Sequence, residues 1–357
     1  MDLQPLIKVL IVDDSLLFRK LLSEILCQDP RIKVIGTASD PIEARAKIKR
    51  LNPDVITLDI EMPRMDGLTF LENIIRLRPM PVVMISTLTE QGADRTMQAM
   101  HMGAVDFIAK PKLKVVTELQ ALAEVITRKI KQAATANIAA LIRNRQNQQR
   151  LQAESIPVLE YPNKKIDLIS IGASTGGTEA IKQILLTLPD KMPPILVVQH
   201  MPPGFTYRFA KALNKLVNLI VKEFNQPEED LLVNHVYIAN GAEHMTVQKS
   251  AGKYRLMCDT SPPVNRHRPS VDVLFNSVAQ SCKHKAIGVI LTGMGMDGAA
   301  GMKNMRSAGA MTIAQDQDSS VVWGMPRIAI EQDAAVQVLP LEEIGHQLVM
   351  QCSNKIN

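Results

Sequence analysis

The sequence of 357 residues is poor in cysteine, in aromatic residues and in long apolar runs. Its four cysteines are scattered without any Cys-x-x-Cys pair, which argues against a disulfide framework and favours a reducing compartment such as the cytoplasm. No run of about 18 apolar residues occurs, so we expect no membrane insertion, and the first residues do not resemble a secretory leader. Aromatic residues make up only 3%, which leaves few rings on which nucleic-acid bases could stack.

The net charge of +5 is concentrated in one part of the chain. Residues 1–111 hold 14 basic and 15 acidic residues, residues 112–165 hold 10 and 4, and residues 166–357 hold 17 of each. We interpret the basic middle segment as a solvated helix and linker, with nucleic-acid binding as the alternative. The length and the ordinary content of apolar residues predict two globular domains around that segment.

Short apolar runs alternate with helical patterns over the first 111 residues. Strands that alternate with helices form parallel sheets, so we predict a five-stranded parallel sheet covered by helices on both faces. The predicted strands are residues 7–12, 34–37, 55–58, 82–85 and 104–109.

Polar residues follow four of these predicted strands: Asp13 and Asp14, Asp59, Ser86 and Lys110. Functional groups of such sheets gather beyond the carboxyl ends of the strands, so we expect these side chains to lie together. Carboxylates in one place repel one another, and Mg²⁺, which prefers oxygen ligands, would relieve the repulsion and neutralise a phosphoryl group on Asp59. Singly, the Asp-Asp pair fits a helix N-cap and the lysine fits a loop; together they favour a phosphoacceptor site.

Residues 7–111 resemble the receiver domain of bacterial response regulators, which has a flavodoxin-like fold. The resemblance rests on residues 12–15, 58–67, 86–87 and 110–111. It implies that Asp59 accepts a phosphoryl group from a chemotaxis sensor histidine kinase, and that Lys110 precedes a cis peptide bond to Pro111. It also implies a Mg²⁺ site made by Asp13, Asp14, Asp59 and the main-chain carbonyl of Glu61, and a switch made by Ser86, Phe107 and Lys110.

The middle segment divides into a helical and a polar part. Apolar residues recur at helical spacing over 115–130, which predicts the last receiver helix. Residues 133–155 are polar with little periodicity, and Pro157 and Pro162 break any further helix. We therefore predict a receiver domain over 1–132, a partly helical linker over 133–164 and a catalytic domain over 165–357.

A glycine-rich turn opens the second domain. An apolar strand over 166–171 leads into Gly-Ala-Ser-Thr-Gly-Gly at 172–177, and a helical pattern follows. This arrangement fits Gly-x-Ser-x-Gly, in which a serine hydroxyl lies on a sharp turn beside helix N-terminal amides. We expect the glycines to let a substrate carbonyl approach the chain. Such turns also bind phosphate, so an anion cradle is the alternative to a nucleophile.

Two further predicted strands end at residues that complete a catalytic triad. The strand over 194–199 ends in His200, and the strand over 286–291 leads to Met294 and Asp297. A serine nucleophile needs a base, and the base needs an acid that fixes its tautomer, so we predict that Ser174, His200 and Asp297 act in series. The main-chain N–H of Met294, with help from Thr175, is the expected oxyanion donor. The chain order Ser, His, Asp differs from that of α/β-hydrolases, which predicts a separate, doubly wound and mainly parallel α/β fold.

The remaining histidines lack partners at metal-ligand spacing. We interpret them as surface residues or satisfied core residues: His101, His235, His244, His267, His284 and His346. Residues 266–272 are expected to open a helix over 270–282, with a role in binding an acidic substrate as the alternative. Residues 323–326 are expected to start another helix, because proline suits a first turn.

Residues 166–357 resemble the catalytic domain of the chemotaxis protein-glutamate methylesterases, on residues 172–178, 199–205, 267–275, 291–302 and 322–327. With the receiver half, the whole chain resembles the response-regulator methylesterases. This implies cleavage of glutamate methyl esters and deamidation of glutamines on methyl-accepting chemotaxis receptors, with no cofactor for the esterase chemistry. It also implies that the unphosphorylated receiver covers the catalytic rim.

The competing hypothesis is a response regulator without enzymatic activity, whose second half binds a nucleotide or a nucleic acid. The glycine turn at 172–177 is its best support. The balanced charge of residues 166–357 and the lack of a recognisable DNA-reading helix pair argue against it.

Overall fold

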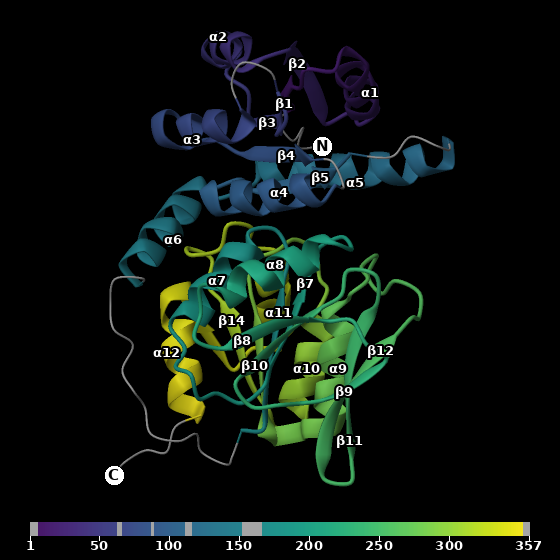
Figure 1. Cartoon of the computed structure of the whole chain (residues 1–357), viewed down its shortest axis with the longest axis vertical. Helices are drawn as coiled ribbons and strands as arrows, with labels where there is room; N and C mark the ends of the chain where they lie inside the picture. The colour runs from purple at the N-terminus through teal and green to yellow at the C-terminus, as the bar shows by residue number, and fades with distance from the viewer. Residues whose placement is uncertain (1–5, 63–65, 87–88, 111–115, 152–165, 353–357) are drawn as a thin grey trace. The chain divides into compact units, whose positions relative to one another are not determined.

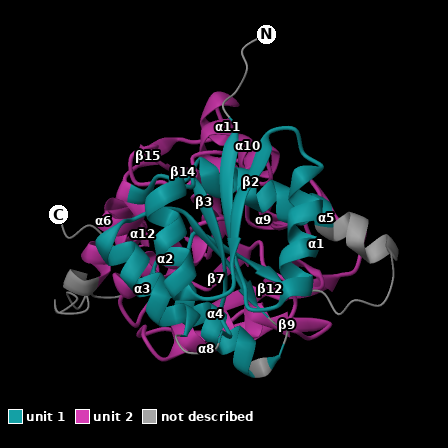
Figure 2. Ribbon diagram, turned by 90° about the horizontal axis from the view of Figure 1, so that it is seen from above, with its two compact units in different colours: residues 1–138 teal, residues 139–357 magenta. Residues whose placement is uncertain are grey.

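The computed structural model describes residues 6–62, 66–86, 89–110, 116–151 and 166–352. The chain forms two compact units, residues 1–138 and residues 139–357, shown in two colours in Figure 2. The predicted cis peptide bond to Pro111 and most of the predicted linker beyond residue 151 lie outside the described residues. Within the described ranges, no helix combines the length and apolar composition needed to cross a membrane.

The first unit contains the predicted five-stranded parallel sheet, with strand order β2-β1-β3-β4-β5. Strands β3 and β4 are buried throughout, which explains their continuous apolar sequence. Helices α1 and α5 pack against each other, and so do α3 and α4. The elements are β1 (Ile7–Val12), α1 (Leu16–Cys27), β2 (Ile32–Ala38), α2 (Pro41–Leu51), β3 (Val55–Asp59), α3 (Gly67–Leu77), β4 (Val82–Ser86), α4 (Glu90–Met102), β5 (Asp106–Ala109) and α5 (Val116–Ala134), labelled in Figure 1 where there is room.

Capping residues fix where the receiver helices begin. The Ser15 side chain accepts the main-chain N–H of Phe18 at the start of α1, so this serine is an N-cap as well as a neighbour of the acidic pair. Asp40 caps α2, and Pro41 occupies its first turn. These caps end strands β1 and β2 at the same edge of the sheet and leave the acidic residues after β1 at that edge.

The second unit is built on a seven-stranded sheet whose neighbouring strands are all parallel, in the order β15-β14-β13-β6-β7-β10-β8. A separate antiparallel sheet has the order β11-β12-β9. The elements are α6 (Ile138–Leu151), β6 (Leu168–Ala173), α7 (Gly177–Leu186), β7 (Ile195–Gln199), α8 (Phe205–Asn214), β8 (Ile220–Phe224), β9 (Glu228–Asp230), β10 (His235–Ala239), β11 (His244–Ser250), β12 (Lys253–Asp259), α9 (Val271–Cys282), a 3-10 turn (Lys283–Lys285), β13 (Ala286–Ile290), α10 (Ala299–Ser307), β14 (Met311–Gln315), α11 (Met325–Glu331), β15 (Gln337–Leu339) and α12 (Leu341–Cys352).

Helices on different faces give this unit its doubly wound architecture. Apolar residues of α9, α10 and α11 form one buried cluster with every second residue of the central strands, including Leu196 and Val198. Helices α7 and α12 pack against each other and against β6 and β14 with residues outside that cluster. From β6 the chain adds β7 on one side, and it later adds β13 on the other side of β6. The order in which strands are added therefore reverses beside β6. In open α/β sheets, ligand sites form at this point.

Helix α6 lies inside the range predicted as linker. The polar side chains of Asn144 and Gln148 are buried and donate to the main-chain carbonyls of Ser319 and Glu179 at 2.9 Å each. Most of α6 therefore belongs to the second compact unit. Its sequence lacks a long apolar stripe because side-chain amide hydrogen bonds to main-chain carbonyls provide much of its attachment.

Candidate active site and phosphoacceptor site

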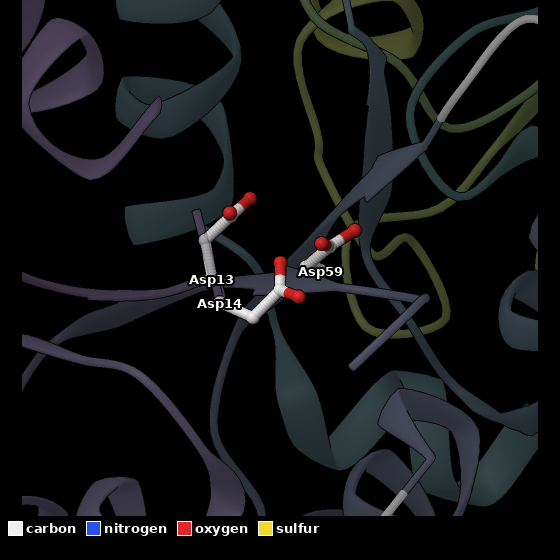
Figure 3. A group of neighbouring side chains, drawn as sticks. All are labelled: Asp13, Asp14 and Asp59. Atoms are coloured by element: carbon white, nitrogen blue, oxygen red, sulfur yellow. The ribbon is translucent and has the colours of Figure 1, made fainter. Parts of the chain in front are cut away.

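Three aspartates of the first unit lie together at the point where the order of its parallel strands reverses, between β1 and β3. Asp13 and Asp14 follow β1, Asp59 ends β3, and one carboxylate oxygen from each lies within 4.8 Å of the others (Figure 3). The Lys110 ammonium lies 2.7 Å from Asp59 Oδ2 and 2.9 Å from Asp13 Oδ2. The structure thus brings together the acidic side chains and the lysine that the sequence predicted for this edge.

The charges in this cluster are incompletely balanced. Burial and the neighbouring Asp13 carboxylate raise the pKa of Asp59 to about 6, although Lys110 works in the opposite direction. Burial alone would lower the pKa of Lys110, but the hydrogen bonds and charges of Asp59 and Asp13 raise it. A lysine shared by two carboxylates leaves net negative charge, which a further cation would neutralise.

The residue types fit Mg²⁺. Three carboxylates with converging oxygens form a hard-ligand set, and one of the three residues, Asp14, is exposed, which leaves room for retained water. The main-chain N–H of Glu61 lies 3.4 Å from Asp59 Oδ1, so the chain turns back over the phosphoacceptor there. The assignment of the Glu61 carbonyl as a ligand remains a prediction.

The predicted switch residues lie on β4 and β5 beside this cluster. Ser86 Oγ donates to the carbonyl of Gly92 at 3.0 Å and accepts from Thr96 Oγ1 at 2.6 Å, so it is bonded to helix α4. Phe107 is buried, with 4% of its surface exposed, and Lys129 lies over its ring. Thr96 has no exposed surface and was missed from the sequence, because a helical threonine carries no motif.

The glycine turn of the second unit holds Ser174 by its main chain. The Ser174 N–H donates to the carbonyl of Thr292 at 3.0 Å, and its carbonyl accepts from Gln199 Nε2 at 2.9 Å and from the N–H of Gly177 at 2.8 Å. The His200 N–H donates to the Ala173 carbonyl at 3.1 Å. The loops after β6, β7 and β13 are therefore connected at this residue.

The glycines at positions 172 and 176 are required for a different reason from the one we expected. A Cβ atom at Gly172 would lie 2.2 Å from a methyl group of Val271, and one at Gly176, whose φ is +79°, would lie 2.7 Å from Val321 Cβ. The space beside both residues is occupied by the protein, so the prediction that these glycines make room for a substrate was wrong. They let α9 and the loop before α11 pack against the turn.

His200 and Asp297 form a direct pair. His200 Nε2 lies 2.8 Å from Asp297 Oδ2, and their side chains are 5% and 2% exposed. This hydrogen bond assigns the proton to Nε2 and the lone pair to Nδ1. His200 Nδ1 is buried and makes no hydrogen bond within the described residues. It is therefore the ring atom available to a serine proton.

Asp297 accepts hydrogen bonds from five groups. Burial alone would raise its pKa, but the hydrogen bond and charge of His200, with the bonds from Asn265 and Ser270, lower the pKa well below its usual range. Two of the donors are the first amides of α9, so the carboxylate also lies at a helix N-terminus. The donors are His200 Nε2 at 2.8 Å, Asn265 Nδ2 at 2.8 Å, Ser270 Oγ at 2.6 Å, the Val271 N–H at 2.7 Å and the Asp272 N–H at 3.3 Å.

The predicted oxyanion residues lie next to the serine. A Cβ atom on Gly293 would lie only 2.7 Å from Ser174 Cβ, so the loop that continues into Met294 contacts the nucleophile directly. The Met294 N–H makes no hydrogen bond within the described part of the chain, and its side chain is 39% exposed. Thr175 is buried, and its carbonyl accepts from Thr292 Oγ1 at 3.0 Å. The catalytic roles of both residues remain predictions.

Sequence reasoning missed three residues that contact this site. Asn265 and Ser270 donate to Asp297, and His267 stacks face to face on His200 with ring centroids 3.7 Å apart. Our interpretation of His267 as a surface or satisfied core residue did not foresee this contact with His200. The segment begins α9 at Val271, as expected, and nothing in its spacing indicated that it returns to the histidine.

Comparisons with known proteins agree with both halves of the chain. The CheB methylesterase family matches residues 169–348, and the response regulator receiver domain family matches residues 9–124. A protein-glutamate methylesterase/protein-glutamine glutaminase of Xanthomonas campestris pv. campestris is 50% identical over 355 residues, which covers 98% of each chain. One of Nitrosomonas europaea, with the same name, is 51% identical and covers 96% of each chain. The crystal structure of the Thermotoga maritima CheB methylesterase catalytic domain is 40% identical and covers 52% of this chain and 98% of that one, with a TM-score of 0.51.

Proposed function

This chain belongs to the CheB methylesterase family, and from that premise we propose that it is a phosphorylation-controlled serine hydrolase of bacterial chemotaxis. Its substrates are glutamate methyl esters on methyl-accepting chemotaxis receptors, and it also deamidates receptor glutamines. Both activities stand in the names of the full-length relatives. The observation that carries the proposal is the His200–Asp297 pair: within the described residues His200 Nδ1 makes no hydrogen bond, and the His200 main chain is bonded to the turn that holds Ser174.

The reaction begins with proton transfer from Ser174 Oγ to His200 Nδ1. The serine oxygen attacks the γ-carbonyl carbon of the substrate, and the carbonyl π-electron pair moves to its oxygen. Asp297 remains ionised and stabilises the imidazolium through the bond to Nε2. The Met294 N–H faces the developing negative charge, and one such donor contributes on the order of 3 kcal/mol to lowering the barrier.

The imidazolium then returns its proton to the leaving group. Methanol departs from an ester and ammonia from an amide, so the same residues serve demethylation and deamidation. Water enters, loses a proton to His200 and attacks the acyl carbon. The bond from that carbon to Ser174 Oγ then breaks, and His200 returns the proton to Ser174 Oγ, so the products are a receptor glutamate and free Ser174. No step needs a metal or an organic cofactor.

Asp59 is the residue that we propose for phosphorylation by a sensor histidine kinase. Asp13, Asp14 and Asp59 are the ligands assigned to Mg²⁺, which supplies neutralising charge to the phosphoryl group. Lys110 holds the two buried carboxylates in place and offers its ammonium to a phosphoryl oxygen. A phosphoryl group adds about −1.5 to −2 charges, which draws Ser86 Oγ away from α4 and shifts Phe107 with it. Phosphorylation therefore controls esterase activity by shifting the receiver toward the conformation in which Ser86 and Phe107 have moved.

We propose a receiver domain over residues 1–132 and a catalytic domain over 165–357. The linker over 133–164 then includes all of α6, whose Asn144 and Gln148 side chains bond to main-chain carbonyls of the catalytic domain. The four cysteines are free, which fits a cytoplasmic location.

Ser174→Ala tests the proposal against nucleotide or nucleic-acid binding. An ester-cleaving enzyme loses methanol release from methylated receptor membranes by at least about 10³-fold, because no other residue replaces the nucleophile. The variant keeps its thermal unfolding midpoint, and Ser250→Ala, an exposed serine at the tip of β11, keeps full activity. Undiminished methanol release by Ser174→Ala would contradict the proposal.

A further inference from the structure

The catalytic histidine is held on two sides. Asp297 contacts its edge at Nε2, and the His267 ring lies over its face, with centroids 3.7 Å apart and planes 4° from parallel. The hydrogen bond from Nε2 still permits the imidazole ring to rock about the Nε2···Oδ2 line. A second ring in contact with the face removes that motion.

The chain delivers His267 by a short, strained hairpin. The main chains of Val264 and His267 exchange two hydrogen bonds, at 2.9 and 3.1 Å. The two residues between them, Asn265 and Arg266, both have left-handed backbones, with φ of 52° and 66°. Left-handed conformations suit asparagine and are costly for arginine, and such strain persists only where the surroundings impose it.

Contacts around the hairpin impose this conformation. His244, which is 1% exposed, donates from Nε2 to the Pro262 carbonyl at 3.2 Å and accepts the Ser270 N–H at Nδ1 at 3.0 Å. It therefore joins the two ends of the segment that carries the turn. At the tip, Asn265 Nδ2 donates to Asp297 Oδ1 at 2.8 Å and to Asp272 Oδ2 at 2.7 Å. The same turn therefore fixes the aspartate through Asn265 and reaches the histidine through His267.

We propose that His267 is a positioning residue for His200: its ring fixes the plane of the catalytic imidazole so that Nδ1 stays directed at Ser174. The inference deepens the proposed esterase function and rests on it. Because His200 becomes cationic during the reaction, a neutral ring face is an attractive neighbour and a second imidazolium would be repulsive.

The test compares His267→Phe, His267→Gln and His267→Ala in the full chain, with methylated receptor membranes as substrate. Phenylalanine keeps a flat ring over His200, whereas glutamine and alanine do not. We expect kcat of the Gln and Ala variants to fall at least about tenfold with KM within about twofold, and His267→Phe to stay within about threefold of wild type. His235→Gln is the matched control, because His235 stacks on Tyr237 at the start of β10, away from the carboxyl ends of the strands, and its loss leaves kcat unchanged.

A spectroscopic measurement separates positioning from folding. In ¹⁵N spectra of the imidazole nitrogens, wild-type His200 shows a protonated Nε2 and an unprotonated Nδ1. His267→Ala broadens or averages these signals while the thermal unfolding midpoint stays within a few degrees, and His267→Phe restores them.

Three results would overturn the inference. They are an unchanged kcat in folded His267→Ala, a loss that His267→Phe does not rescue, and a rise in KM at constant kcat, which would make His267 a substrate-binding residue instead. Ser174→Ala is measured in parallel. If it retains activity the proposed function fails, whereas an inactive Ser174→Ala beside a fully active His267→Ala defeats the positioning role alone.

Discussion

The two units place a buried aspartate at the carboxyl edge of the same kind of sheet and give it opposite acidity. Asp59 ends β3 and Asp297 lies in the loop after β13, each beside the point where the strand order reverses, and they are 3% and 2% exposed. The pKa of Asp59 is raised to about 6, whereas the pKa of Asp297 lies far below its usual range. Burial is therefore not what distinguishes the two carboxylates.

The neighbours of each carboxylate account for the difference. Asp59 shares the Lys110 ammonium with Asp13, and the Asp13 carboxylate repels it. Asp297 accepts five hydrogen bonds, and the donor that it shares with the nearby Asp272 carboxylate is the neutral amide of Asn265. The receiver site is thus left with excess negative charge, which a metal cation can neutralise before a phosphoryl group is transferred. The Asp297 carboxylate is fully hydrogen-bonded before substrate arrives, as expected for a group that must only stabilise a transient imidazolium.

Of the variants that test this difference between Asp59 and Asp297, Asp297→Asn should have the largest effect on activity. The amide cannot balance an imidazolium and can favour the wrong tautomer of His200, so kcat for methanol release should fall about 10³- to 10⁴-fold. Asp272→Asn is the matched variant, since Asp272 is also buried and also bonded to Asn265 but does not contact His200, and its loss should be far smaller. Equal losses in the two variants would show that the direct contact with His200 is not what matters.

The receiver site should make stability depend on pH and Mg²⁺. Because the folded pKa of Asp59 is raised, its contribution to stability is fully present below about pH 4 and is lost as the pH rises through about 6. At pH 7.5 without metal, the loss of this contribution lowers the free energy of unfolding by up to about 3 kcal/mol, and Mg²⁺ should restore part of it.

Urea unfolding of the full chain, followed by a probe in the receiver unit, measures this effect. Mg²⁺ should stabilise the protein more at pH 7.5 than at pH 5, and Asp59→Asn should be more stable than wild type at pH 7.5 without metal. Glu24→Gln, an exposed change on α1, should leave both quantities unaltered. A metal-free receiver that gains stability between pH 5 and 7.5 would speak against the unbalanced charge.

Ser270→Ala tests one of the hydrogen bonds that lower the pKa of Asp297, and it should have a smaller effect on activity. Removing one donor from Asp297 should raise its pKa and lower kcat by about tenfold at most, since a hydrogen bond to a charged group contributes about 1.5 kcal/mol. Ser281→Ala, on the same helix and bonded to the Val247 carbonyl, should leave kcat unchanged. The experiment measures kcat and the pH dependence of kcat for both variants.

Much of both sites was predictable because apolar strands end at polar residues. Parallel strands bring their carboxyl ends to one edge, so Asp13 with Asp59, and Ser174 with His200, could be expected to meet. The contact of His267 with His200 could not be predicted, because it depends on a turn of two left-handed residues that contains no glycine. Helix α6 was partly missed for another reason: Asn144 and Gln148 are buried through hydrogen bonds, which leave no hydrophobic period to detect.

The opposite acidities of Asp59 and Asp297 can be measured directly by a ¹³C-carboxyl NMR titration of the metal-free full chain with labelled aspartate. Asp59→Asn and Asp297→Asn assign the two resonances. The account predicts that Asp59 titrates near pH 6 and that the pKa of Asp297 lies well below the ordinary range of an aspartate. An Asp297 signal that titrates at or above its ordinary value, or an Asp59 signal at its ordinary value or below, would contradict it.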